Sequence, residues 1–249
     1  MTEKYWVPAI DRTNSILTII SEESKGLRLM EIAERSNVNK SSLFSILNTL
    51  EQLGWINKDI DQTYSLGAKL GFLGSKYIHQ FDLTTVFNRE AEKTMRIIGE
   101  TIQLSILDGK EIIYLAKKNG SSRVRVVTEP GMRFPAHATA MGKVMLSAFS
   151  KDELKEKYEE SEFEKFTTYT IDNLDDLFKQ LDKLEKTGYL IETQEAVKGF
   201  TCIASPVLNE RNMIIAAVSI TMDNESWTQK KDICIEEIIS LSKRISMTG

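Results

Sequence analysis

The stretch that decides the fold is residues 39–54, NKSSLFSILNTLEQLG. Its apolar residues are spaced for one buried helical face: Leu43, Ile46, Leu47, Leu50 and Leu53. At about 100° per residue, a group of small polar residues lies on the opposite face: Ser41, Ser45, Asn48 and Gln52. Asn39 stands where a helix N-cap is favoured, and Gly54 stands where a helix is closed at its C-terminal end. The sequence therefore predicts a short amphipathic helix whose outer face is polar and almost uncharged.

The segments on both sides of this helix complete a winged helix-turn-helix. Upstream, residues 29–33 carry the buried face of a shorter helix, and residues 37–38 form the turn between the two. Downstream, residues 55–58 and 63–66 have the pattern of a hairpin, which would form the wing. Residues 10–20 carry an apolar stripe that predicts a first helix and closes a three-helix core. The alternative is that these helices are one corner of a larger all-α core.

The outer face of the central helix has the chemistry of a DNA-reading surface. Hydroxyl and amide groups can hydrogen-bond base edges and phosphates in a major groove. The polar residues of this helix that are predicted to bind DNA are Ser41, Ser42, Ser45 and Asn48. The predicted phosphate partners are Arg12, Arg28, Lys40 and Lys58. Residues 1–80 hold nine basic and nine acidic residues, so their net charge is zero, and we expect affinity to come from a dimer that contacts phosphates twice.

Composition places the chain among globular proteins. Its 249 residues are enough for two domains of ordinary size. They are 41% hydrophobic and 27% charged, a composition that favours neither a disordered protein nor a membrane protein. The longest strongly apolar segment, residues 213–220, is far shorter than the roughly 20 residues of a membrane span. Residues 1–8 lack the features of a secretory signal. We therefore expect a cytoplasmic protein with no membrane partner.

The cysteines and histidines have no spacing that is typical of a metal site or a disulfide framework. Cys202 and Cys234 are the two cysteines, and His79 and His137 are the two histidines. We expect both cysteines to be reduced, and we predict no metal and no cofactor.

Beyond the wing, the pattern predicts a linker helix and then a second domain. The predicted division is 1–66 for the winged helix-turn-helix, 67–81 for the linker helix and 82–249 for the second domain. In that domain, helices are predicted near residues 84–100, 139–149, 151–159, 174–187 and 229–246, and strands near 102–107, 112–116, 124–128, 189–193, 201–208 and 213–221. The predicted fold class is α+β, with a mixed α/β second domain in which helices pack on one antiparallel sheet.

Three short motifs give the whole chain a resemblance to a known family. They are Ile10-Asp11-Arg12 at the start of the first helix, FPAHATAMGK at residues 134–143 and GFTCIASPV at residues 199–207. With these motifs, the order of winged helix, linker helix and mixed α/β domain resembles the bacterial IclR-type transcriptional regulators over nearly the whole chain. Within that family, the chain is similar to repressors of sugar-acid catabolism, such as those that sense 2-keto-3-deoxygluconate.

The resemblance implies a homodimer or a dimer of dimers that binds a palindromic operator through its N-terminal domains. The C-terminal domain would be a GAF-like effector-binding and oligomerisation domain that holds a small metabolite, often a carboxylate or sugar acid. The pocket residues implied by position are Ala140, Met141, Glu192, Cys202, Ser219 and Thr221. Backbone N–H groups at a helix start favour an anion, and residues 219 and 221 would offer two hydroxyls on one side of a strand. These two residues could equally be β-favouring residues of a half-exposed face.

Three positions depart from the pattern of the family. Glu192 stands where many relatives have Asp, Met141 is bulkier than the small residue of some relatives, and Ser45 replaces a common Arg. We therefore expect a reshaped pocket, and a base contact inherited at position 45 is in doubt.

Three candidate catalytic residues also have structural alternatives. Cys202 lies between apolar neighbours and is a buried structural cysteine or a pocket contact before it is a reactive thiol. His137, between two alanines, is more typical of a structural histidine than of a ligand or base. Glu192 and Glu195 are close in sequence but need not face one another as an acid and base pair. No catalytic residue is therefore predicted.

The leading functional hypothesis is a ligand-responsive, DNA-binding repressor of a catabolic operon, and not an enzyme. One alternative is a constitutive DNA-binding protein whose C-terminal domain only forms the oligomer. The other is a GAF-like enzyme that uses Cys202 or Glu192 and carries an appended winged helix.

Overall fold

The computed structural model describes residues 6–23, 25–79, 83–122, 126–158 and 163–246. The chain divides into two compact units, residues 1–80 and 81–249, and each is described by itself.

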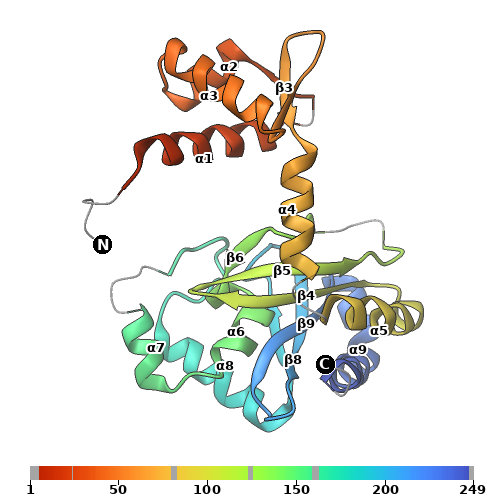
Figure 1. The fold of residues 1–249 in the computed structure, drawn as a ribbon. Helices are drawn as coiled ribbons and strands as arrows, with labels where there is room; N and C mark the ends of the chain where they lie inside the picture. Colours follow the sequence, from red (N-terminus) through yellow and green to blue (C-terminus); the bar gives the residue numbers. More distant parts are fainter. Residues whose placement is uncertain (1–5, 24, 80–82, 123–125, 159–162, 247–249) are drawn as a thin grey trace. The chain divides into compact units, whose positions relative to one another are not determined.

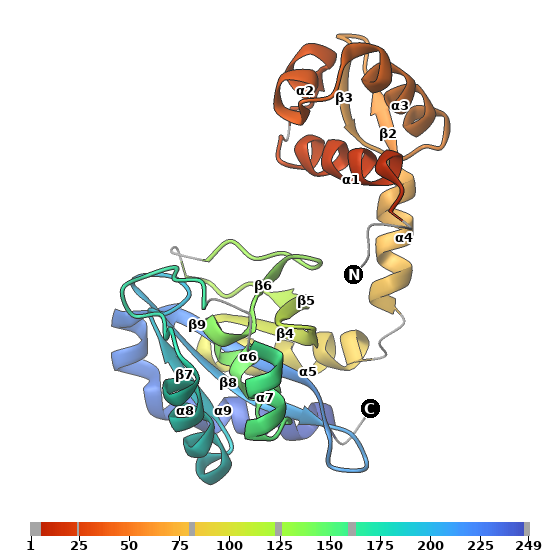
Figure 2. The same ribbon diagram turned by 90° about the vertical axis from the view of Figure 1, so that its left-hand side faces the viewer.

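The first unit is a winged helix-turn-helix followed by the helix α4 (Figures 1 and 2). Its elements are α1 (Pro8–Ser21), β1 (Leu27–Arg28), α2 (Leu29–Ser36), α3 (Lys40–Gln52), β2 (Ile56–Lys58), β3 (Thr63–Leu66) and α4 (Ala68–His79). Apolar residues of the three helices and the small sheet form one core: Ile16, Ile20, Leu27, Ile32, Leu43, Leu47, Leu50, Ile56 and Tyr64. The predicted three-helix core and wing are confirmed.

Helix α3 begins and ends where the sequence predicts. The Asn39 side chain accepts a hydrogen bond from the backbone N–H of Ser42 at 2.9 Å. At the other end, the backbone N–H of Trp55 donates to the carbonyl of Leu50 at 2.9 Å, and Gly54 has a φ of +70°, which a residue with a side chain rarely adopts. Local chemistry at both caps thus sets the length of this helix.

Three features of the first unit differ from the prediction. Leu53 belongs to the predicted buried face of α3, but it is 54% exposed because it stands at the C-cap, beyond the last turn that packs on the core. Ile10 belongs to the predicted apolar stripe of α1, but its side chain is 68% exposed because only the later turns of α1 face the core. Strand β1 was missed; its two residues pair antiparallel with β3 and give the sheet order β1-β3-β2. A strand of two residues is too short to show a period-2 pattern.

The second unit is a six-stranded antiparallel sheet with helices on both faces (Figures 1 and 2). Its strands are β4 (Thr101–Asp108), β5 (Glu111–Lys118), β6 (Arg133–Pro135), β7 (Leu190–Thr193), β8 (Phe200–Leu208) and β9 (Ile214–Asp223), in the order β6-β5-β4-β9-β8-β7. Its helices are α5 (Leu83–Ile98), the 3-10 turn η2 (Ala136–Ala138), α6 (Ala140–Leu146), α7 (Lys151–Tyr158), α8 (Leu174–Thr187) and α9 (Asn224–Ser246).

The sheet separates two hydrophobic cores. Helices α5 and α9 pack on one face, where Phe87, Leu104 and Ile238 are fully buried. Helices α6, α7 and α8 enclose a second core that contains Val144 and Leu177. This mixed architecture confirms the predicted fold class.

One predicted strand of the second unit is wrong. Residues 126–128 are not a strand, and residues 124–125 lie outside the described part of the chain. The edge strand beside β5 is β6, which follows the predicted turn at residues 129–131. Tyr114 of β5 exchanges backbone hydrogen bonds with Gly131 and Met132, so the segment after the turn takes the free edge of β5.

No helix among the described residues is both long enough and apolar enough to cross a lipid bilayer.

Candidate effector cavity and DNA-reading face

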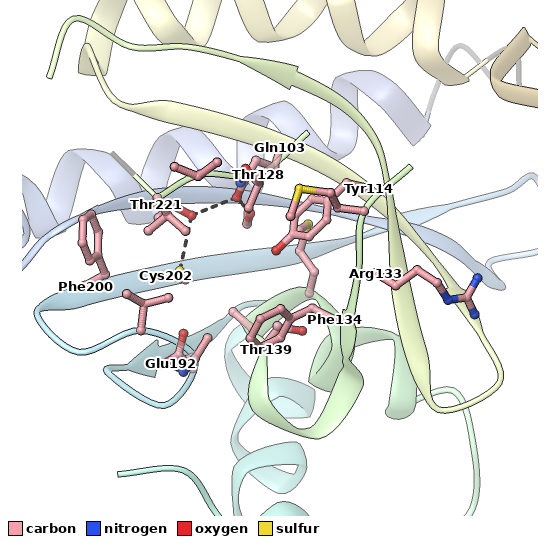
Figure 3. A pocket seen from close by; sticks show the side chains of 18 residues that line it. Gln103, Tyr114, Thr128, Arg133, Phe134, Thr139, Glu192, Phe200, Cys202 and Thr221 are labelled. Atoms are coloured by element: carbon pink, nitrogen blue, oxygen red, sulfur yellow. Dashed lines mark hydrogen bonds between the residues drawn. The ribbon is translucent and has the colours of Figure 1, made fainter. Parts of the chain in front are cut away.

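A cavity in the second unit is lined by all six residues of the predicted effector pocket. They are Ala140, Met141, Glu192, Cys202, Ser219 and Thr221. The cavity has a volume of about 140 Å³. The structure thus brings together residues from one helix and three strands, and their contact with an effector stays a prediction (Figure 3).

The helical side of the cavity depends on Thr139, which follows the turn η2, and on Gly142 of α6. The hydroxyl of Thr139 caps α6 by accepting a hydrogen bond from the backbone N–H of Gly142 at 3.0 Å. Gly142 is required because a Cβ at this position would overlap the backbone of Ala136. This close packing places Ala140 and Met141, both buried, at the cavity wall.

The strand side of the cavity follows from the register of β7, β8 and β9. Cys202 lies opposite Glu192 on one neighbouring strand and opposite Thr221 on the other. Its Sγ atom lies 3.3 Å from Oγ1 of Thr221 (Figure 3). The Glu192 carboxyl accepts hydrogen bonds from the backbone N–H groups of Glu195 and Ala196, which hold it in place.

Gln103 of β4 was missed by sequence reasoning, although it binds both hydroxyls of the predicted site. Its Oε1 accepts hydrogen bonds from Oγ of Ser219 at 3.2 Å and from Oγ1 of Thr221 at 3.0 Å. Its amide nitrogen donates to Oγ1 of Thr128 at 2.5 Å. A signal was present in the sequence, since every second residue from 101 to 105 is polar in a strand that is otherwise apolar.

The remaining lining of the cavity is mostly apolar, and it was also missed. It includes Tyr114, Val126, Val127, Met132, Phe134, Val197 and Phe200. These residues come from several loops and strands, so no regular spacing connects them. An engineered protein cavity of about 150 Å³ holds benzene, so a cavity of this size suits a compact molecule.

Glu192 and Arg133 are the charged residues among the described ones that line the cavity. The guanidinium of Arg133 points away from the other labelled side chains and forms ion pairs with Asp108 at 2.6 Å and Glu111 at 2.8 Å (Figure 3). Burial raises the pKa of Glu192 to about 7, against the opposing effect of the Glu195 backbone N–H. At neutral pH, this carboxyl is therefore divided between its protonated and ionised forms.

A buried ion pair lies behind Glu192. Nζ of Lys143 on α6 lies 2.5 Å from Oε1 of Glu195 and 2.9 Å from Oε1 of Gln180 on α8. Burial lowers the pKa of Lys143, and the nearby carboxylate of Glu195 opposes that shift. The carboxyls of Glu192 and Glu195 thus have separate partners.

Cys202 and His137 both have surroundings that favour structural or binding roles. Burial raises the pKa of the Cys202 thiol, and the neighbouring charge of Glu192 raises it further, so the reactive thiolate is disfavoured. Nε2 of His137 lies 3.0 Å from the carbonyl of Glu164, and its ring packs edge-on against Phe163. Among the described residues, no group of three or more His, Cys, Asp or Glu is arranged to hold a metal ion.

The predicted DNA-reading residues all lie in the first unit, on α1, β1, α3 and β2. Exposed ones are Arg12, Arg28, Lys40, Ser41 and Ser45, and partly exposed ones are Ser42, Asn48 and Lys58. Nζ of Lys58 lies 5.5 Å from the centre of the Tyr64 ring, which supports this side chain on the wing. Contact with DNA stays a prediction for all eight. Phe44, beside them on α3, is 50% exposed and was not predicted.

Comparison with known proteins assigns both units to one family. The IclR helix-turn-helix domain matches residues 9–59, and the C-terminal domain of the bacterial transcriptional regulator IclR matches residues 75–247. The chain is 32% identical over 216 residues to the HTH-type transcriptional regulator KdgR of Dickeya chrysanthemi, and this covers 86% of the chain and 70% of that protein. It is 27% identical over 232 residues to the HTH-type transcriptional repressor AllR of Salmonella typhi, covering 93% and 85%.

A solved structure agrees with these matches. The crystal structure of the Thermotoga maritima IclR has a TM-score of 0.78 and 27% identity, and the match covers 96% of this chain and 99% of that one. The KdgR relative supports the predicted resemblance to the sugar-acid repressor subgroup. The chain is therefore a member of the IclR family of bacterial transcriptional regulators, with a DNA-binding helix-turn-helix domain and a C-terminal ligand-binding domain.

Proposed function

We propose that this protein represses a catabolic operon and that a compact carboxylate, in the cavity beside α6, changes its affinity for the operator. The observation that carries this proposal is the convergence of the Ser219 and Thr221 hydroxyls, the Cys202 thiol and the Glu192 carboxyl on a cavity of about 140 Å³. The hydroxyls of Ser219 and Thr221 can donate to a ligand carboxylate if they leave Gln103. Glu192, when protonated, can donate as well.

We assign DNA binding to residues 1–66, connection to residues 67–81 and effector binding with oligomerisation to residues 82–249. The active species in this proposal is a homodimer or a dimer of dimers in the cytoplasm. The first 80 residues have no net charge, so two copies are needed to provide enough phosphate contacts. The effector would bias two arrangements of the dimer, of which only one fits half-sites about 34 Å apart. A coupling of about 1–3 kcal/mol would change operator affinity by roughly 5- to 150-fold.

The two alternatives are less well supported. An enzyme that uses Cys202 would need its thiolate, which burial disfavours. A C-terminal domain that only forms oligomers has no need of a cavity with polar groups directed into it, whereas this domain has one.

The first experiment measures binding to DNA and its response to ligands. The full-length protein is titrated onto its own upstream intergenic DNA by fluorescence anisotropy, with and without a panel of 2-keto and sugar-acid carboxylates. We expect salt-dependent binding that one compound weakens, and we expect a Ser219→Ala, Thr221→Val double variant to bind the DNA but ignore that compound. Binding that responds to no compound supports the oligomerisation alternative, and turnover that is lost in Cys202→Ala supports the enzyme.

The second experiment tests the reading face. Ser45→Ala and Asn48→Ala are expected to weaken operator binding. Thr18→Ala serves as the matched control, because it lies on α1 outside the reading helix and its hydroxyl, like that of Ser45, donates to the carbonyl one turn earlier. Lys58→Ala is expected to weaken binding to all sequences and to lower the salt slope by about 1. Unchanged binding in Ser45→Ala and Asn48→Ala would show that another face reads the DNA.

A further inference from the structure

Phe44 is a large apolar side chain on the outward side of the reading helix. It is 50% exposed, whereas its neighbour Leu43 is fully buried in the core of the unit. On a helix surface, residues three and four apart are neighbours, with Cβ atoms about 5–6 Å apart. Phe44 is therefore adjacent both to Ser41, one turn before it, and to Asn48, one turn after it. The predicted polar face thus has an aromatic residue at its side.

The outer face of α3 has an unusual chemistry for reading a DNA duplex. The sequence of α3, KSSLFSILNTLEQ, contains no arginine, and its lysine, Lys40 at the first position, is assigned to a phosphate in the proposed function. The contact of a basic side chain to guanine is therefore not assigned to this helix. Instead, amide groups are provided by Asn48 and by Gln52, which is exposed. An asparagine or glutamine amide matches the N6 and N7 atoms of adenine, and an apolar side chain such as Phe matches the 5-methyl group of thymine.

We propose that α3 reads an A·T-rich half-site, in which Phe44 packs against the 5-methyl group of a thymine and the Asn48 amide binds an adenine. This proposal rests on the proposed function, because it requires α3 to lie in the major groove. Phe44 is the fifth residue of α3, in the N-terminal part of the helix, where recognition helices contact base edges. The short side chains of Ser41 and Ser45 leave room beside the ring for a close approach to the groove floor.

The size of the effect follows from the area that a methyl group buries. Removing one buried methyl from the contact lowers affinity about fourfold, and two half-sites bound by a dimer would give about 15-fold. Replacing thymine by deoxyuridine removes this methyl group and leaves the Watson–Crick pairing unchanged. The contact can therefore be tested from the DNA side without any change to the protein.

The experiment begins with the full-length protein and a library of random duplexes, from which bound sequences are selected. The affinity of the wild type for the selected duplex is then measured by anisotropy while each thymine in turn is replaced by deoxyuridine in both half-sites. Phe44→Ala, Phe44→Leu and the control Leu53→Ala are measured on the same set. Leu53, at the end of α3, is similarly exposed at 54% but lies away from the polar face, so it separates reading from general loss of apolar surface.

We expect one thymine position at which deoxyuridine weakens the wild type and Leu53→Ala about 15-fold. Phe44→Ala is expected to bind both duplexes equally, because the partner of the methyl group is gone, and Phe44→Leu is expected to keep part of the difference. A difference that persists unchanged in Phe44→Ala, or that appears at no thymine, overturns the inference while leaving DNA binding intact. If the wild type selects no duplex at all, the proposed function itself fails and the inference fails with it.

Discussion

The outer face of α3 and the cavity beside α6 both present serine or threonine hydroxyls, but these hydroxyls are satisfied in different ways. On α3, the hydroxyl of Ser45 donates to the carbonyl of Ser41 one turn earlier, and the side chain remains exposed to water. In the cavity, Ser219 and Thr221 are buried and donate to Gln103, which is more than a hundred residues away in the sequence. Water can replace a lost partner at the first site but not at the second. Substitutions on the reading face should therefore change DNA binding alone, whereas substitutions in the cavity should also change stability.

The largest effect is expected beneath the reading face rather than on it. Leu47→Ala empties a fully buried position of the first core and should lower the free energy of unfolding of this unit by about 2–5 kcal/mol. Hydrogen exchange of the full-length protein should show faster exchange in residues 8–66 and none of this change in residues 101–223. The control Leu53→Ala, at an exposed position, should leave exchange unchanged. Equal destabilisation by both changes would show that burial does not distinguish the two sides of α3.

The second largest effect concerns the charge of Glu192. Its pKa is raised from 4.5 to about 7 in the folded protein, so the folded state holds the proton more tightly than the unfolded chain. The contribution of this group to stability is therefore fully present below pH 4.5, falls as the pH rises to about 7 and is absent above it. Glu192→Gln, which keeps the oxygen that accepts the backbone N–H groups, should be more stable than the wild type by about 3 kcal/mol at pH 8.

Urea unfolding at pH 5 and pH 8 measures this difference. The gain of Glu192→Gln should be much smaller at pH 5, and the exposed control Glu51→Gln should show no such pH dependence. In the proposed function, the affinity of the wild-type protein for its carboxylate effector should also fall as the pH rises above 7, because Glu192 is then ionised. That decline should be absent in Glu192→Gln. An equal gain at both pH values would mean that Glu192 does not titrate in this range.

The third largest effect is expected when a glutamine is replaced by leucine in the cavity, compared with the same replacement on the outer face of α3. Gln103→Leu leaves the buried hydroxyls of Ser219 and Thr221 without their shared acceptor and should destabilise the second unit by about 1–3 kcal/mol. Gln52→Leu, on the exposed face of α3, should stay within roughly 0.5 kcal/mol of the wild type. Thermal unfolding of both variants measures the difference. Similar losses in the two variants would contradict the distinction between water-accessible and buried polar groups.

The smallest effect is expected at the helix caps, which are local in both units. Asn39→Ala removes the cap of α3, and Asn173→Ala removes the equivalent cap of α8, in which the side chain accepts the N–H of Asp176 at 2.9 Å. Each should lower the stability of its own unit by about 1 kcal/mol, as measured by hydrogen exchange. Asn14→Ala, on the exposed side of α1, is the control. A loss that spreads to the other unit would show that the caps have more than a local role.

Predictions from the sequence were accurate where the deciding interactions are local. The helix predicted at residues 174–187 is found at Leu174–Thr187, because Asn173 and Gly188 mark its two ends chemically. The predictions from the sequence failed for β6. A three-residue edge strand is defined by its pairing with β5 and has no periodic pattern of its own. The six cavity residues were placed through resemblance to a family, while Gln103 and the apolar wall were not found.

The sequence by itself determined the winged helix, the two caps of α3 and the polar face that we propose reads DNA, since these depend on periodicity and on residues within a few positions of one another. Only the tertiary structure decided how the cavity is closed and how its groups are charged. The hydrogen bonds from Ser219 and Thr221 to Gln103 and the raised pKa of Glu192 exist because the sheet order places β4 beside β9 and buries these groups beneath α6. Such contacts depend on which distant strands become neighbours, and local patterns carry no record of that choice.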